Sequence, residues 1–266
     1  MKLTFLIPPC YDNKQPAERS AGCTRIVYPM INIYELTAAA TLREAGHEVD
    51  YRDFVSDGQE PEAFDRFLSR DLSDAYLIWS VNLSLDSDLK AVEHIRMFHR
   101  DTPVILMGPA PTYYMHRALY DSHTYLVRGE PELTLLELTD CLSRRERPID
   151  VKGVTFVGPG NNRVSNPPRP LNMDLDSLPF PARDLLKGRQ YHNPKLKTGP
   201  YTTMFTSRNC PFHCIFCVPS SLTFAREIEY HKEHPGVKPK IGFRSLESVE
   251  KEVDMLAAEG YKAIGF

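Results

Sequence analysis

The sequence predicts an α/β protein whose first 150 residues form an open parallel sheet of the flavodoxin-like or Rossmann-like kind. Three observations predict this fold class. Short apolar segments alternate with helix-like segments over residues 1–150, prolines are frequent over residues 151–200, and a new strand–helix–strand pattern begins at residue 201. With 266 residues, 42% of them hydrophobic and 25% charged, the chain can bury more than one core. We therefore predict three regions, at 1–150, 151–200 and 201–266.

Strands and helices alternate through the first region. Leu3–Pro8 is a short apolar run before a second proline, and we predict it as a buried first strand. Met30–Ala45 is predicted as a helix because Gly46 follows it as a stop, and Pro131 suits the first turn of a helix that runs to Arg144. The remaining strands are expected at His47–Tyr51, Ala75–Ser80, Val104–Met107 and Thr124–Val127, and the remaining helices at Pro61–Arg70 and Asp86–Arg100.

The candidate binding segments of this region follow from its topology. Ligands of an open parallel sheet bind beyond the carboxyl ends of the strands. The loops that begin after Pro8, Ser80, Met107 and Val127 are therefore the segments in which we expect a ligand site.

The second and third regions have a different character. Val154–Val157 and Arg163–Ser165 are predicted to pair as a hairpin, and the prolines that follow predict a linker with a restricted backbone. The third region is expected to contain a strand at Tyr201–Ser207, a helix at Leu246–Glu259 ended by Gly260, and another strand at Lys262–Phe266.

Charge and hydropathy narrow the possible partners. The formal net charge is -3 and no block of Lys and Arg stands out, so the sequence gives no electrostatic footprint for nucleic acid and favours a small-molecule substrate. No apolar run approaches the roughly 20 residues of a membrane span, and the N-terminus lacks a secretory pattern. We therefore expect a cytoplasmic protein without a membrane span.

Three of the six cysteines form a motif. Cys210, Cys214 and Cys217 have the spacing C-x3-C-x2-C directly after a predicted strand. Clustered thiols in a reducing compartment are typically metal ligands. Three thiolates can hold three irons of a [4Fe-4S] cluster and leave the fourth iron open. An open iron can bind the amino and carboxylate groups of S-adenosylmethionine.

Two other metal chemistries remain as alternatives for this motif. A structural zinc site would take its fourth ligand from His213, His231 or His234, although a three-residue gap between thiols is unusual for zinc. A ferredoxin-type electron carrier would need a fourth cysteine nearby, and the sequence has none there.

The segment Thr206-Ser-Arg-Asn-Cys-Pro-Phe-His-Cys-Ile-Phe-Cys217 resembles the T-S-R-G-C-P-x-x-C-x-F-C segment of cobalamin-binding radical S-adenosylmethionine enzymes, and departs from it at Asn209. The resemblance places Phe216 beside the adenine of S-adenosylmethionine. Two further segments, Leu178–Arg183 and Val127–Glu130, are similar to the family's interdomain L-P-x-P-A-R and its V-R-G-E turn. The resemblance covers essentially the whole chain and implies that residues 201–266 begin a TIM-type radical barrel.

The resemblance also implies a cobalamin site. Met107–Thr112 is similar to the family's G-G-P-H-A-T loop, from which Met107 and Ala110 depart. A histidine ligand to cobalt would require a D-x-H-x-x-G motif, and the nearest match, Asp121–Leu126, lies before the fifth strand, so we expect no histidine on cobalt. The implied cobalamin contacts are Pro9, Cys10, Ser80, Val81, Asn82, Leu83, Ser84, Gly108, Pro109, Ala110, Pro111, Thr112, Gly129 and Glu130.

A function follows from these two cofactors. The resemblance implies a C-methyltransferase that uses a 5'-deoxyadenosyl radical and methylcobalamin, supplied with electrons by a flavodoxin or ferredoxin. The alternatives are a cobalamin-dependent oxidation or cyclisation like that of anaerobic magnesium-porphyrin cyclase, a methylthiotransferase, and a non-catalytic cofactor carrier. A methylthiotransferase would hold a second cluster on Cys10, Cys23 and Cys141. A complete radical barrel needs more strands, so we expect either a fragment or a second polypeptide that completes the barrel.

Overall fold

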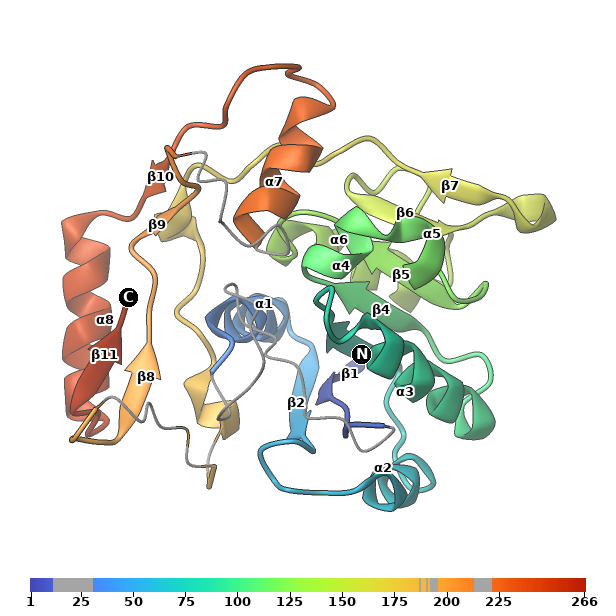
Figure 1. Cartoon of the computed structure of the whole chain (residues 1–266), viewed down its shortest axis with the longest axis horizontal. Coiled ribbons are helices and arrows are strands. Elements are labelled where there is room, and N and C mark those ends of the chain that lie inside the picture. Colours follow the sequence, from blue (N-terminus) through green and yellow to red (C-terminus); the bar gives the residue numbers. More distant parts are fainter. Residues whose placement is uncertain (12–30, 187, 190, 192–195, 213–221) are drawn as a thin grey trace.

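A seven-stranded sheet is the largest element of the computed structural model (Figure 1). The structure describes residues 1–11, 31–186, 188, 189, 191, 196–212 and 222–266. The first five strands are parallel in the order β2-β1-β3-β4-β5, which confirms the predicted parallel sheet. The predicted hairpin does not stay in the linker, because β6 pairs antiparallel with β5 and adds β7 to the sheet. In sheet order the strands are β2 (Glu48–Asp53), β1 (Lys2–Ile7), β3 (Ala75–Trp79), β4 (Val104–Met107), β5 (Thr124–Val127), β6 (Val154–Val157) and β7 (Arg163–Ser165).

The parallel strands are apolar throughout because both faces of the sheet are covered. Successive side chains of a strand point to opposite faces. Leu77 and Trp79 of β3 accordingly pack in one hydrophobic core, whereas Tyr76 and Ile78 pack in the other. A continuous apolar run rather than an alternating one is the expected pattern of such a strand.

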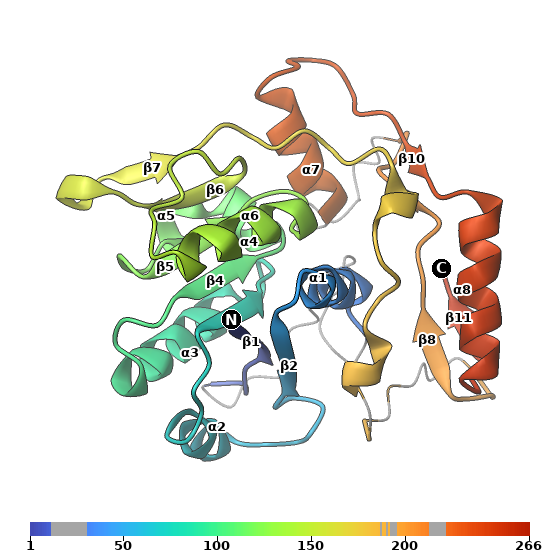
Figure 2. The same ribbon diagram turned by 180° about the vertical axis from the view of Figure 1, so that it is seen from behind.

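Helices cover the two faces in pairs. Helices α1 (Ile33–Glu44) and α6 (Glu132–Ser143) pack together over one face, and α2 (Pro61–Leu68) and α3 (Leu85–Phe98) over the other. Both views place α1 between the sheet and the C-terminal strands (Figures 1 and 2). Helix α1 is therefore one layer between the sheet and the C-terminal strands.

The structure corrects the predicted boundaries at two places. Helix α1 begins at Ile33, where the side chain of Asn32 accepts a hydrogen bond from Glu35 N, and Met30 lies outside the described residues. Two short helices, α4 (Pro109–Tyr113) and α5 (Met115–Ala118), occupy the segment that was predicted as a loop after β4. Pro109 fits there because proline suits the first turn of a helix.

The C-terminal region contains two small strand pairs. β8 (Tyr201–Thr203) pairs in parallel with β11 (Ala263–Gly265), and α8 (Leu246–Ala258) lies between them in sequence. The predicted strand at Tyr201–Ser207 is divided, because the chain leaves β11 after β8 and pairs again only as β9 (Ser207–Arg208) with β10 (Gly242–Phe243). Helix α7 (Leu222–His231) was not predicted. The start of a barrel in this region stays a prediction.

The linker is fixed by side-chain bonds as well as by its prolines. It contains the 3-10 turns Pro159–Asn161, Leu175–Ser177 and Arg183–Leu186. Arg183 is buried and donates hydrogen bonds to Thr202 Oγ1 at 3.0 Å and to Glu252 Oε1 at 2.7 Å. The neighbouring Ala182 N donates to Leu36 O of α1 at 3.1 Å. One short segment thus bonds the C-terminal region to the sheet domain.

Among the described helices, none has the length and apolar character to cross a bilayer.

Candidate functional site

The predicted cobalamin loops after β3 and β4 meet at the carboxyl edge of the sheet. Trp79 and Met107 are opposite each other in the ladder, and Ser80 N donates to Met107 O at 2.8 Å. The backbone of α4 closes the contact, because Ala110 N donates to Ser80 O at 3.1 Å. The structure therefore brings together the two segments that the sequence proposed as one site.

Gly108 has a structural role inside this contact. Its φ is +95°, and a Cβ atom there would lie 2.8 Å from Ser80 O and 3.0 Å from the ring of Trp79. A side chain at this position would therefore clash with the protein itself. The close packing of β3 and β4 is sufficient to require this glycine, and its contact with cobalamin stays a prediction.

The neighbouring loop residues are mostly held by each other. Thr112 is buried and its Oγ1 accepts a hydrogen bond from Gly129 N at 3.2 Å, which joins the segments after β4 and β5. Ser84 Oγ donates to Asp88 Oδ2 at 2.6 Å at the start of α3. Leu83 is exposed. Pro9 is buried after β1, and Cys10 Sγ lies 3.8 Å from Tyr11 O.

Three buried polar atoms at this edge have no hydrogen-bond partner within the described part of the chain. They are Trp79 Nε1, Ser80 Oγ and Asn82 Oδ1. Buried polar atoms are normally paired. Unpaired donors and acceptors on one sheet edge fit a bound polar molecule, and the phosphate, ribose and amide groups of a cobalamin could supply their partners.

A buried cluster of charged residues lies beside these loops. Glu130 Oε1 lies 2.9 Å from Arg226 Nε and 3.3 Å from Arg208 Nη1. Arg208 Nη2 also donates to Glu132 Oε1 at 2.5 Å. Burial lowers the pKa of Arg208, but the carboxylates of Glu132 and Glu130 outweigh it and raise this pKa above the ordinary value. The pKa of Arg226 is lowered, because burial dominates there.

The cluster extends to the linker and to α7. Asn172 N of the linker donates to Glu130 Oε2 at 2.8 Å. Arg128 Nη1 lies 3.4 Å from Glu229 Oε2 of α7, and α7 also packs against α4. The V-R-G-E turn therefore holds together three parts of the chain: the sheet, the linker and the residues on both sides of the cysteine motif.

Aromatic side chains connect the charged cluster with α1, which contains Tyr34. Tyr34 stacks with Trp79 at 6.2 Å and with Phe205 at 5.6 Å between ring centroids. The guanidinium of Arg208 lies 4.8 Å from the ring centroid of Phe205. No sequence motif marked Tyr34, Glu132 or Arg226 as a site residue. Arg208 lies within the recognised motif, but its partners depend on tertiary contacts.

The cysteine motif is only partly within the described residues. Cys210 is partly exposed, whereas Cys214, Cys217 and Phe216 lie outside the described residues, as does His213. The described residues contain no group of three metal-binding side chains. His231 lies 3.8 Å from Glu227, and His234 lies against the ring of Tyr230. The metal of this motif therefore stays a prediction.

Asn209, the departure from the family pattern, has a conformational explanation. Its φ is +74°, a left-handed conformation that glycine adopts freely and asparagine tolerates better than most residues. Its side chain donates to Lys240 O at 2.7 Å. The sequence change from glycine to asparagine thus preserves the turn into Cys210.

Comparison with known proteins gives two methyltransferases as relatives. The chain is 34% identical over 166 residues to an uncharacterised methyltransferase of Pyrococcus horikoshii. The aligned region covers 61% of this chain and 32% of the relative. It is 26% identical over 240 residues to cytidylyl-2-hydroxyethylphosphonate methyltransferase of Streptomyces wedmorensis. This alignment covers 73% of this chain and 44% of the relative. The chain thus spans less than half the length of these relatives. No family model matches it.

Solved structures share the fold. OxsB, a cobalamin-dependent S-adenosylmethionine radical enzyme solved with aqua-cobalamin and S-adenosylmethionine, matches with a TM-score of 0.68 at 17% identity, covering 97% of this chain and 31% of OxsB. The radical S-adenosylmethionine methyltransferase TsrM of Kitasatospora setae was solved with cobalamin and a [4Fe-4S] cluster. It matches with a TM-score of 0.66 at 16% identity, and the match covers 99% of this chain and 46% of TsrM. The chain has the fold of these enzymes over nearly its whole length.

Proposed function

We propose that this chain carries the cobalamin-binding and cluster-binding segments of a cobalamin-dependent radical S-adenosylmethionine enzyme that methylates carbon. One observation carries the proposal: Arg208, two residues before Cys210, is bonded to Glu130 and Glu132 at the sheet edge where the loops after β3 and β4 meet. The segment that leads into the cysteine motif therefore starts beside the predicted cobalamin loops. An enzyme that uses both cofactors on one substrate requires such proximity.

The comparisons support the same class of enzyme. Both relatives are methyltransferases, and the proteins that share the fold use S-adenosylmethionine in radical reactions. Their similarity supports the recognition of the family that the cysteine motif suggested. The substrate, the electron donor of the flavodoxin or ferredoxin type and the methylation of carbon are proposals for this chain.

Several residues of the chain would hold the cofactors. Cys210, Cys214 and Cys217 would bind the cluster, and Phe216 would lie beside the adenine of S-adenosylmethionine. The unpaired Ser80 Oγ and Asn82 Oδ1 would receive polar groups of cobalamin. Together, these cofactors supply a radical that removes hydrogen from the substrate and a methyl group that replaces it.

The role of the protein itself is to hold the cysteine segment and the cobalamin loops in fixed positions relative to each other. Glu130 forms ion pairs with Arg208 before the motif and with Arg226 after it, so the sheet edge holds both flanks of the cysteine segment. Arg183 bonds the linker to Thr202 and Glu252, which orients β8 and α8 against α1. Such fixed positions allow two cofactors to act on one substrate carbon.

Isotope transfer tests the proposal. Anaerobically reconstituted protein would be incubated with S-adenosylmethionine labelled in its methyl group, cobalamin, a strong reductant and candidate substrates. We expect label in cobalamin and in the product, together with 5'-deoxyadenosine. Formation of 5'-deoxyadenosine without any label in cobalamin would contradict methyl transfer and would favour the oxidative reaction instead.

A further inference from the structure

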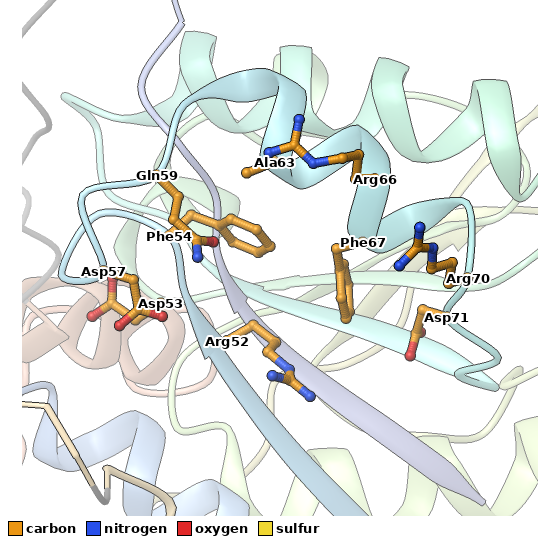
Figure 3. A pocket seen from close by; sticks show the side chains of 10 residues that line it. All are labelled: Arg52, Asp53, Phe54, Asp57, Gln59, Ala63, Arg66, Phe67, Arg70 and Asp71. Carbon is orange, nitrogen blue, oxygen red and sulfur yellow. The ribbon is translucent and has the colours of Figure 1, made fainter.

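A pocket lies away from the predicted cofactor site, at the β2 edge of the sheet and under α2 (Figure 3). Its volume is about 420 Å³, within the range of small-molecule sites. It extends from the carboxyl end of β2 across α2 to the turn before β3. The residues that line it are Arg52, Asp53, Phe54, Asp57, Gln59, Ala63, Arg66, Phe67, Arg70 and Asp71.

Asp71, one of the three acidic residues in the wall, is already neutralised from outside the pocket. Its Oδ1 lies 2.9 Å from Lys2 Nζ, and its Oδ2 accepts hydrogen bonds from Ser73 N and Tyr76 OH, each at 2.9 Å. Burial alone would raise its pKa, but these bonds lower the pKa of Asp71 to about 2. This carboxylate is therefore ionised, and its charge is matched by Lys2.

The other two acidic residues have partners in the linker. Asp57 accepts two hydrogen bonds from the guanidinium of Arg189, at 2.9 and 3.1 Å. Asp53 is buried and accepts a hydrogen bond from Tyr191 OH at 2.8 Å. Each of the three carboxylates thus has at least one partner that does not line the pocket.

The arginines of the pocket, in contrast, keep free donors. Arg66 and Arg70 are four residues apart at the end of α2, and neither side chain has a hydrogen bond or ion pair within the part of the chain that the structure describes. Among the described residues, Arg52 pairs with Asp50 alone: its Nε donates to Asp50 Oδ2 at 2.9 Å, and its Nη2 lies 2.8 Å from the same oxygen. Its guanidinium lies 5.6 Å from the ring centroid of Phe67. Figure 3 shows Phe67 between the guanidinium groups of Arg52 and Arg70.

These groups define the ligand chemistry. Arginine binds phosphate through paired N–H donors and is favoured wherever phosphate is recognised. The half-buried ring of Phe67 gives the pocket an apolar wall, which a bare inorganic anion would not use. The favourable interaction of a cation with a helix C-terminus explains an arginine near the end of α2, but it does not explain a pocket lined by three.

We propose that this pocket binds an organic phosphate, with its phosphate groups at the arginines of the wall, Arg52, Arg66 and Arg70, and the organic part against Phe67. The proposal does not depend on cobalamin or on the cysteine motif, because none of the predicted cofactor residues lines the pocket.

Calorimetric titration of the whole chain with ADP, in buffer without divalent metal, tests the proposal. The test variant is Arg66→Gln/Arg70→Gln, and we expect it to weaken ADP binding by about tenfold or more, since it removes charged hydrogen-bond donors to phosphate. The matched control is Arg100→Gln/Arg163→Gln, which removes two exposed arginines outside the pocket and changes the net charge equally. The control should bind ADP within about threefold of the unmodified chain.

Inorganic pyrophosphate serves as the second probe and should bind more weakly than ADP because it cannot contact Phe67. Three results would overturn the proposal. They are absence of ADP binding to the unmodified chain, equal weakening in both double variants, and pyrophosphate binding as tight as that of ADP. All four exchanged arginines are exposed, so unfolding of the variants is not expected to obscure the result.

Discussion

The carboxylate of Glu130 lies 2.9 Å from Arg226 Nε, and both side chains are buried. Glu130 follows β5 in the sheet, whereas Arg226 belongs to α7, after the cysteine motif. The same carboxylate lies 3.3 Å from Arg208, before the motif. One side chain at the carboxyl edge of the sheet thus forms ion pairs with both flanks of the segment that contains the cysteine motif.

The first prediction concerns the stability of this junction. In Glu130→Ala, the buried guanidinium of Arg226 loses the ion-pair partner that it has among the described residues, and Arg208 retains its pair with Glu132. Removal of one member of a buried ion pair typically costs about 3–5 kcal/mol because the remaining charge is uncompensated. We expect denaturant unfolding to show a loss of this size.

Glu137→Ala is the control for this prediction. Glu137 is half-exposed and pairs with Arg169 at 2.6 Å. Such pairs contribute at most about 1 kcal/mol. Equal losses of stability in the two variants would show that the buried network does not hold the junction.

The second prediction concerns the cluster. Replacement of Cys210, Cys214 or Cys217 by Ala should abolish iron and sulfide incorporation, because each thiolate is expected to bind one iron. Cys141→Ala, in α6, should retain the full iron content. Metal and sulfide analysis after anaerobic purification would decide this, and stoichiometric zinc in place of iron would rule out the iron-sulfur assignment.

The third prediction concerns cobalamin and Ser80. The Oγ of Ser80 is buried without a described partner, so Ser80→Ala should leave the cobalamin-free protein as stable as before or slightly more stable. The same change should weaken cobalamin binding by about 2- to 10-fold, which is the loss of affinity expected when one hydrogen bond is removed. Thermal unfolding and a spectroscopic binding titration would measure the two effects.

His123→Ala should leave cobalamin binding unchanged, because this partly exposed histidine lies before β5, at the amino edge of the sheet. Loss of binding in that variant, with its fold intact, would refute the absence of a histidine ligand. A bulky residue in place of Gly108 is a less informative variant, since its side chain would meet Ser80 O and Trp79 and disturb the fold itself.

The fourth prediction concerns acid stability. The pKa of Asp71 falls from its ordinary value of 3.8 to about 2 in the folded protein, owing to hydrogen bonds from Ser73, Lys2 and Tyr76 that outweigh its burial. A lowered folded-state pKa stabilises the fold above the unfolded value, and this stabilisation disappears as the pH falls through the folded value. Unfolding free energies should therefore decrease more steeply between about pH 4 and 2 in the unmodified chain than in Asp71→Asn.

The exposed Asp150→Asn is the control for the acid measurement and should follow the profile of the unmodified chain. If Asp71→Asn also follows it, the bonds to Lys2 and Tyr76 do not stabilise the folded state as the structure indicates.

Local sequence patterns determined the parallel sheet and its carboxyl edge. Apolar runs such as Val104–Met107 indicate strands covered on both faces, and Gly46 and Pro131 mark helix ends through backbone preferences that act over a few residues. Helix α7 was not predicted, although its residues have an amphipathic pattern like that of α8. Its contacts with the sheet depend on Arg226 and Glu229, whose partners lie about 100 residues away in sequence.

The sequence by itself determined that three cysteines have metal-binding spacing and that the loops after β3 and β4 lie on one edge, because spacing and strand order are encoded locally. Only the tertiary structure decided that Gly108 is required by Trp79 and Ser80, and that Glu130 pairs with Arg208 and Arg226. Those relationships depend on distances between side chains that are remote in sequence. A glycine or glutamate carries no local mark of the group it will meet, since that group is selected by packing and charge when the layers of the fold assemble.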